Sequence, residues 1–294
     1  MRQSSVILAL KFFNGGKMNI RLTGFALVLI NLFFAMNVWA QNVNQFYTEE
    51  ANANYWQQQY AAAPSGSWQE SQARQSRDLA ISRAVQSVTP YSFQGTPWQQ
   101  IESFADQINQ KYAAAPSGGA IESMYRQVRD VAYQAFNQEL QNYVQYFSND
   151  WRQINDLALQ MDQKYAAAPS GSQKENAYNQ ARRTLYQRIP QAVDQEYSRM
   201  WNFRDAENMA VYFAGLYAAA PSGSLKESIY LQVRNSGYTQ AQQKFSQQAY
   251  SMSQQELWQV QDEYDRKYAA APSGSMQETY YRQIRDQARG LIHP

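Results

Sequence analysis

The string Tyr-Ala-Ala-Ala-Pro-Ser-Gly occurs five times in this chain without a change, starting at Tyr60, Tyr112, Tyr165, Tyr217 and Tyr268. The starts are 52, 53, 52 and 51 residues apart. A nearly constant period of this length is typical of repeat proteins, in which each repeat buries its apolar face against its neighbours. The chain is therefore an array of one structural unit rather than a scaffold around one special pocket.

The stretch before each string has the apolar spacing of one face of a helix. In the second repeat, apolar residues recur at steps of three and four from Trp98 to Tyr112, which predicts a helix whose apolar stripe includes the string's Tyr and third Ala. A Pro follows that Ala, and the residue before a Pro is disfavoured in the α region, so we expect the helix to end there. Helix-start signals precede the stripes: Thr96 with Pro97, Asp150, Asn202 and Ser253.

A second helix is predicted directly after each string. Ser67, Ser172, Ser224 and Ser275 each precede a Glu by three residues, which is the capping-box pattern, and the second repeat has Gly119 with Glu122. Each repeat is therefore a helical hairpin with a Pro-Ser-Gly elbow. The predicted fold class is all-α: tandem helical-hairpin repeats with a period of about 52 residues, forming an α-solenoid-like array or an elongated helical bundle. Pro90 should stop the second helix of the first repeat, and Pro190 should kink or stop that of the third.

The predicted segments follow from these signals. They are a signal peptide at 1–40, with Met18 as an alternative start, repeat 1 at 41–95 as the N-terminal cap, repeat 2 at 96–149, repeat 3 at 150–201, repeat 4 at 202–252, and repeat 5 at 253–294 as the C-terminal cap.

The signal peptide is predicted from an apolar run that follows Lys17 and Arg21 and ends in Val38-Trp39-Ala40, a small-residue cleavage pattern. An uncleaved anchor is the alternative, because the run is just long enough to span a bilayer. Cleavage after Ala40 removes four basic residues and no acidic ones, which lowers the formal net charge by four, from +2 to −2. We therefore expect a periplasmic or extracellular protein with no stable membrane span after cleavage and no nucleic-acid partner.

Composition limits the chemistry that the chain can carry. It has no Cys, and its single His is the penultimate residue, His293. Thiolate sites, disulfides and His-based triads are therefore absent or confined to the terminus, and we expect no cofactor, no metal and no catalytic residues. The only recurring acid is a helix cap, so paired catalytic carboxylates of the glycosidase kind have no support.

The candidate binding residues are the Ser-Gly pair of each elbow and an Arg seven residues after each capping Glu. They are Ser65, Gly66, Ser117, Gly118, Ser170, Gly171, Ser222, Gly223, Ser273 and Gly274, with Arg77, Arg129, Arg182, Arg234 and Arg285. Two interpretations of the Arg stay open: a structural contact with a carboxylate or helix end of the adjacent hairpin, or a repeated anion or glycan site. The elbows are much more alike than the flanking helices, and the Ser-Gly tip has no complete structural explanation in the sequence.

These features predict an exported, non-enzymatic structural or binding protein of a bacterial-type cell envelope or its exterior. All hairpins enter and leave in the same sense, so the elbows should form a ladder along one edge. Such a ladder gains affinity when its partner is also repetitive, for example a glycan, peptidoglycan or another copy of the chain. The alternatives are an envelope enzyme acting on polysaccharide or cell wall through a groove, and a self-assembling fibre component.

Overall fold

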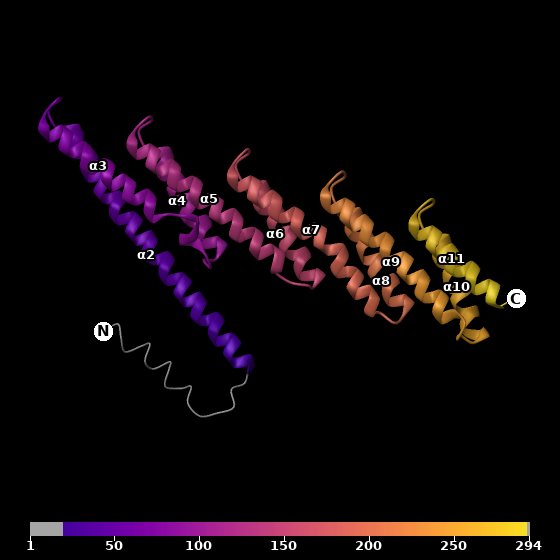
Figure 1. The fold of residues 1–294 in the computed structure, drawn as a ribbon. Helices are drawn as coiled ribbons and strands as arrows, with labels where there is room; N and C mark the ends of the chain where they lie inside the picture. Colours follow the sequence, from indigo (N-terminus) through magenta and orange to yellow (C-terminus); the bar gives the residue numbers. More distant parts are fainter. Residues whose placement is uncertain (1–19, 293–294) are drawn as a thin grey trace. The chain divides into compact units, whose positions relative to one another are not determined.

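The structure, a computed structural model, describes the backbone of residues 20–292 and the side chains of residues 38–292. Within this part of the chain the fold is all-α, with ten α-helices and one short 3-10 helix (Figure 1). The elements are α2 (Ile20–Ala62), α3 (Trp68–Ser87), η1 (Pro90–Phe93), α4 (Trp98–Ala114), α5 (Ala120–Tyr146), α6 (Trp151–Ala167), α7 (Gln173–Arg199), α8 (Phe203–Ala219), α9 (Leu225–Ala249), α10 (Gln254–Ala270) and α11 (Met276–Ile292). They pack as consecutive hairpins, which confirms the predicted fold class.

The first helix of a hairpin ends one residue earlier than predicted. In α4, α6, α8 and α10 the last helical residue is the second Ala of the string, and the third Ala is the C-cap. Ala115, for example, has φ −73° and ψ 144°. This extended conformation is the one that a following Pro imposes.

Most of the predicted helix starts are confirmed. Asp150, Asn202 and Ser253 accept hydrogen bonds from the backbone in the first turn of their helices. The prediction for Thr96 is wrong, because α4 begins at Trp98 with Pro97 at the cap position. Thr96 is instead buried behind η1, where its backbone N–H donates to the Phe93 carbonyl at 3.0 Å. This hydrogen bond ties Thr96 to the 3-10 turn, so Thr96 does not cap α4.

The two prolines outside the elbows behave differently. Helix α3 ends at Ser87, before Pro90, as predicted. Helix α7 continues through Pro190 to Arg199 without a break. A Pro removes one helical hydrogen bond and crowds the preceding turn. Ile189 and Val193 are fully buried on either side of it, so tertiary packing of α7 outweighs that local cost.

The apolar stripe of the first helices forms the core, as predicted. Ile101, Ala105 and Ile108 are fully buried, and so are their equivalents in α6 and α8. The string's own Tyr and third Ala are only half-buried in all five repeats. They lie at the elbow end of the hairpin, where fewer neighbouring side chains cover them.

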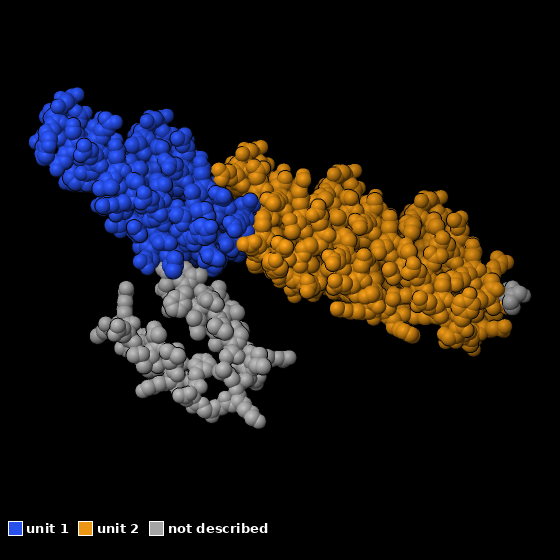
Figure 2. Space-filling model, in the orientation of Figure 1, with its two compact units in different colours: residues 1–140 blue, residues 141–294 orange. Residues whose placement is uncertain are grey.

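The chain divides into two compact units, residues 1–140 and 141–294 (Figure 2). In unit 1, α2 packs against α3, and Tyr133 of α5 donates to Asp106 of α4 at 2.9 Å. In unit 2, the hairpins α6–α7, α8–α9 and α10–α11 follow one another, and their second helices α7, α9 and α11 pack in that order.

The predicted signal peptide lies mostly outside the described side chains. Residues 1–19 are not described, and of residues 20–37 only the helical backbone is. Helix α2 passes without interruption through the predicted cleavage site at Ala40. Among the described residues, no helix combines the length and the apolar character that a membrane span requires.

Candidate functional site

Each elbow is a tight turn that needs a glycine. The N–H of the residue after Pro-Ser-Gly donates to the carbonyl of the Pro three residues earlier, for example Ser172 to Pro169 at 3.1 Å. The intervening Gly171 has φ +74°, and the other four elbow glycines have φ between +74° and +77°. A β-turn with positive φ at its third residue is a type II turn, which favours Gly there. An added Cβ would meet nothing within 4 Å at any elbow glycine, so conformation and not space explains this residue.

The elbow glycines have a second structural role. Each of their backbone N–H groups donates to the carboxylate of the Glu that follows four residues later, at 2.5 Å in all five repeats. In four repeats the backbone N–H of the same Glu also donates to the hydroxyl of the Ser that caps the helix, at 3.0–3.2 Å. The glycine half of the Ser-Gly tip therefore has a complete structural explanation, which the sequence did not reveal.

The remaining exposed residues of the string have no such explanation. The first two Ala, the Pro and the Ser of the tip are exposed in every repeat. The side chains of the five tip serines make no hydrogen bond within the described part of the chain; they are Ser65, Ser117, Ser170, Ser222 and Ser273. An exposed helix position tolerates many residue types with little change in stability. We call this surface, the two exposed Ala with the Pro and the tip Ser, the elbow face.

The five candidate Arg side chains stack on the Tyr that opens the string of their own hairpin. The guanidinium carbon lies 4.1–4.9 Å from the ring centroid in the pairs Arg77–Tyr60, Arg129–Tyr112, Arg182–Tyr165, Arg234–Tyr217 and Arg285–Tyr268. Stacks of this kind contribute about 0.5–1 kcal/mol each at half-exposed sites. The Arg joins the two helices of one hairpin, and this differs from the expected contact with an adjacent hairpin.

Polar partners hold the same guanidinium groups in place. Arg77, Arg182 and Arg285 reach the residue three positions before their Tyr, namely Gln57 at 3.0 Å, Asp162 at 3.1 Å and Asp265 at 3.5 Å. Each Arg lies about ten residues into its helix, roughly 15 Å along the axis from the elbow. The structure thus groups Arg with Tyr and leaves the Ser-Gly tip apart from both; whether either group binds a partner stays a prediction.

Successive hairpins of unit 2 are offset along their helix axes. Ser236 of α9 donates to Asp194 of α7 at 2.8 Å, although these residues are 42 apart and the local repeat step is 52. Ser246 of α9 and Gln287 of α11 meet at 3.0 Å, 41 apart against a step of 51. The difference is ten residues in both cases, or about 15 Å along a helix. Within unit 2 the elbows therefore lie at one edge, as predicted, but as steps of a staircase (Figure 1).

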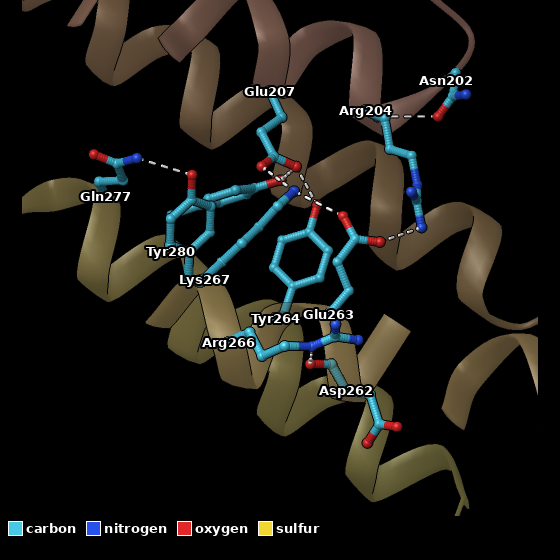
Figure 3. Close-up of polar contacts among 11 residues, drawn as sticks. Asn202, Arg204, Glu207, Asp262, Glu263, Tyr264, Arg266, Lys267, Gln277 and Tyr280 are labelled. Atoms are coloured by element: carbon cyan, nitrogen blue, oxygen red, sulfur yellow. Dashed lines mark hydrogen bonds and ion pairs between the residues drawn. The ribbon is translucent and has the colours of Figure 1, made fainter. Parts of the chain in front are cut away.

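A buried polar joint sets this register. In unit 1, Lys111 donates to the buried carboxylate of Glu50 at 2.5 Å, and the Tyr125 hydroxyl donates to it at 2.6 Å. In unit 2, Lys267 and Tyr264 donate to Glu207, which is only 3% exposed (Figure 3). The acid always belongs to the earlier hairpin and the Lys to the later one.

Where the third and fourth hairpins meet, both the acid and the Lys of this joint are replaced. Counting from the string's Tyr, the Glu50 and Glu207 position is occupied in the third repeat by Asn155, and the Lys position of the fourth repeat by Leu216. Asn155 accepts from Tyr230 at 2.6 Å, so the Tyr contact is kept and the charge pair is removed on both sides. At the ends of the array, where a hairpin lacks a neighbour, these positions hold Gln59, Ala73 and Trp258.

Burial governs the electrostatics of the joints. It raises the pKa of Tyr125 to about 12, with a further contribution from the hydrogen bond to Glu50. Burial by itself would lower the pKa of Lys267, but hydrogen bonds and attraction from Glu207 and Glu263 outweigh it and hold that pKa above its ordinary value. The joint is a structural ion pair in which the acid is shielded from solvent, whereas the Lys111 and Lys267 side chains are 38% and 33% exposed. The sequence signal that could have revealed it is the recurrence of Glu ten residues before the string's Tyr and of Lys directly before it; Tyr264 does not occupy the position of Tyr125.

Among the described residues, no group of three or more His, Asp or Glu side chains is placed to hold a metal ion. No family model matches the chain, and no match was found among curated proteins or solved structures. The elbow face is therefore the candidate site, on the evidence of the chain's own repeats.

Proposed function

We propose that this chain is an exported, non-enzymatic repeat protein of a cell envelope or its exterior, which presents repeated elbow faces to a repetitive partner. The observation that carries the proposal is the identity of the elbow face in all five repeats, although its Ala and Ser side chains are exposed and the Ser hydroxyls are unbonded. The Gly, the capping Glu and the Tyr–Arg stack are explained by the hairpin itself. The elbow face is not, so a partner accounts for it.

The chemistry of the elbow face favours an uncharged partner. Its side chains are methyl groups, a Pro ring and a hydroxyl, and the Arg behind it is stacked and bonded inside the hairpin. One such face binds weakly, and several faces on one rigid unit bind together only when the partner repeats as well. Envelope polysaccharide or peptidoglycan fits this requirement, and export through the predicted signal peptide would bring the chain to it.

The test compares two sets of three substitutions that add the same charge to the same three hairpins. One variant carries Ser65→Lys, Ser117→Lys and Ser170→Lys at the tips. The control carries Gln58→Lys, Gln110→Lys and Gln163→Lys, which lie on exposed helix positions two residues before the string. Both should keep the circular dichroism and melting temperature of the parent chain, because none of the six side chains is buried.

Binding is measured by sedimentation with peptidoglycan sacculi and with insoluble neutral polysaccharides. We expect the tip variant to lose at least tenfold in apparent affinity and the control to lose little, since avidity falls steeply with the number of working sites. Equal losses in both variants, or no binding by the parent chain, would overturn the proposal. Mass spectrometry of the protein recovered from a secreting host tests export, with Gln41 expected as the first residue.

A further inference from the structure

The connections between hairpins carry a second repeated feature, at the end opposite the elbows. Each of the four connections presents one aromatic side chain to solvent: Tyr91, Tyr146, Trp201 and Tyr250, with exposed fractions of 83%, 80%, 87% and 80%. Among the described residues these are the large hydrophobic side chains with an exposed fraction of 80% or more. Single exposed aromatics are common on protein surfaces, but one per connection in every connection is a pattern.

The connections hold these side chains out without using them for packing. Trp201 sits between α7 and α8, where its backbone carbonyl accepts from the side chain of Gln248 at 2.5 Å. Tyr250 is the C-cap of α9, and its backbone is followed by two further turn hydrogen bonds. The backbone of each connection is thus anchored while the ring stays free, which is a rigid platform at low entropic cost.

In unit 2 an amide-lined groove adjoins the Trp201 connection. It lies between α7 and α9 and has a volume of about 620 Å³. Its polar lining includes Gln187, Gln191, Gln195, Gln232, Asp194 and Ser198. The last lining residue on α7 is Ser198, three residues before Trp201, so the groove ends about one helical turn before the connection that carries the most exposed ring.

We infer that the connection aromatics are stacking platforms for a neutral, linear polysaccharide, and that the groove between α7 and α9 binds the sugar hydroxyls next to Trp201. Flat rings stack on the apolar face of a pyranose, and planar amides and carboxylates pair with its hydroxyls as donors and acceptors. The groove offers four amides and one carboxylate and no basic side chain, which suits an uncharged ligand rather than an anionic one.

The arrangement fits a polymer better than a membrane. A membrane-inserting tip needs a continuous apolar surface, usually with basic residues beside it. Here each connection exposes a single ring, and Asn202 follows Trp201 and Ser251 follows Tyr250, although Met200 and Arg199 precede Trp201 and the half-buried Phe147 follows Tyr146. Successive platforms in unit 2 share the stagger of their hairpins, about 15 Å along the axis for each step. A polysaccharide chain can reach several of them, whereas a disaccharide can reach only one.

This inference concerns the opposite end of the hairpins from the elbow face, so either can fail alone. The test uses affinity electrophoresis of the purified chain in gels that contain soluble β-1,4-glucan or glycol chitin, and calorimetry with the hexasaccharide and disaccharide of each. The first variant combines Tyr91→Ala, Tyr146→Ala, Trp201→Ala and Tyr250→Ala. The second, Gln191→Ala with Gln195→Ala, alters the groove and leaves all rings in place.

A matched control is available at the elbow end. Trp68, the first residue of α3, is 75% exposed, so Trp68→Ala removes an equally accessible ring away from the connections. We expect Trp201→Ala alone to weaken hexasaccharide binding about fivefold to tenfold, the fourfold variant to keep only the retardation that the unchanged elbow faces supply, and Gln191→Ala with Gln195→Ala to weaken binding severalfold. Trp201→Tyr should retain most of the affinity, and Trp68→Ala should have no effect.

Several outcomes would overturn the inference. They are the absence of retardation of the parent chain in either gel, equal affinity for disaccharide and hexasaccharide, and an equal loss in the Trp68→Ala control. Sedimentation velocity supplies a further one: if the parent chain self-associates and the fourfold variant is monomeric, the rings bind a second copy of the chain instead. Binding of the parent chain to neutral lipid vesicles that the fourfold variant loses would also contradict it.

Discussion

Lys267 of the last hairpin donates to Glu207 of the hairpin before it at 2.7 Å, and Glu207 is almost completely shielded from solvent. The two residues are 60 positions apart, nine more than the local repeat step. The pair therefore holds the two first helices, α8 and α10, in their staggered register.

We expect Glu207→Gln to lower the free energy of unfolding by about 1–2 kcal/mol, because a neutral amide replaces the buried carboxylate that accepts from Lys267 and Tyr264, while Lys267 keeps its ion pair with Glu263 at 2.8 Å. Urea denaturation followed by circular dichroism measures the change. Asp262→Asn, on the exposed side of α10, removes the same charge and should change stability by less than about 0.5 kcal/mol. The combination Glu207→Asn with Lys267→Leu copies Asn155 and Leu216 and should recover most of the loss. Failure of this combination to recover would contradict the joint's role.

Two neighbouring elbow residues should differ in their effect on stability: the turn conformation requires Gly171, whereas the Ser170 side chain makes no hydrogen bond within the described residues. Gly171→Ala should destabilise the chain by about 1 kcal/mol, because Gly171 has φ +74° and an L side chain is strained there even though space is available. Ser170→Ala, one residue earlier, should leave stability unchanged within about 0.5 kcal/mol. Thermal melting of both variants decides the point. A large loss in Ser170→Ala would mean that the tip Ser has a structural role after all.

Two glycines inside helices should respond in opposite directions to the same change. A Cβ on Gly237 would lie 2.1 Å from the Tyr197 hydroxyl and 2.8 Å from the Ala210 Cβ, where α7, α8 and α9 meet. Gly237→Ala should therefore destabilise by about 1–3 kcal/mol through overpacking. Gly215 in α8 has nothing within 4 Å, so Gly215→Ala should stabilise by about 1 kcal/mol through helix propensity. Chemical denaturation compares the pair, and equal effects would contradict the close helix crossing.

Alkali should destabilise the folded chain before it damages the backbone. The pKa of Tyr125 in unit 1 and that of Tyr230 in unit 2 are raised by burial to about 12, above the ordinary value of 10.0. A raised tyrosine pKa means that the unfolded chain loses its proton first, so this stabilisation is complete below pH 10 and is lost as the pH rises toward 12. Near-ultraviolet tyrosinate absorbance and circular dichroism should therefore change together in that range.

The control for the alkaline prediction is a pair of Phe substitutions. Tyr125→Phe removes a buried hydroxyl and should flatten the fall in stability between pH 10 and 12, at some cost to stability at neutral pH. Tyr91→Phe, at an exposed ring, should leave the curve as it is. Identical curves for the two variants would show that the buried hydroxyls do not govern alkaline unfolding.

Much of the fold could be predicted because its causes are local. The stripe around Ile101 and Ile108, the caps Asp150 and Ser172, and the Pro that ends each first helix act over a few residues, and the sequence shows them directly. The cap at Thr96 was predicted wrongly, and of the two outcomes predicted for Pro190, a kink or a stop, the stop is wrong, because burial of neighbouring surfaces overrode a local preference. The exposed rings of the connections were missed because an aromatic residue in a sequence favours the core by default.

By itself, the sequence determined that this protein is a tandem array of helical hairpins, that the elbows repeat without change, and that thiol chemistry is absent. The tertiary structure alone decided how one hairpin meets the next: the ten-residue slide of α9 along α7, the pairing of Glu207 with Lys267, and the stacking of Arg182 on Tyr165. The reason is physical. Helix and turn preferences act between neighbours in the chain, whereas register between helices depends on side chains some 40–60 residues apart that only packing brings together.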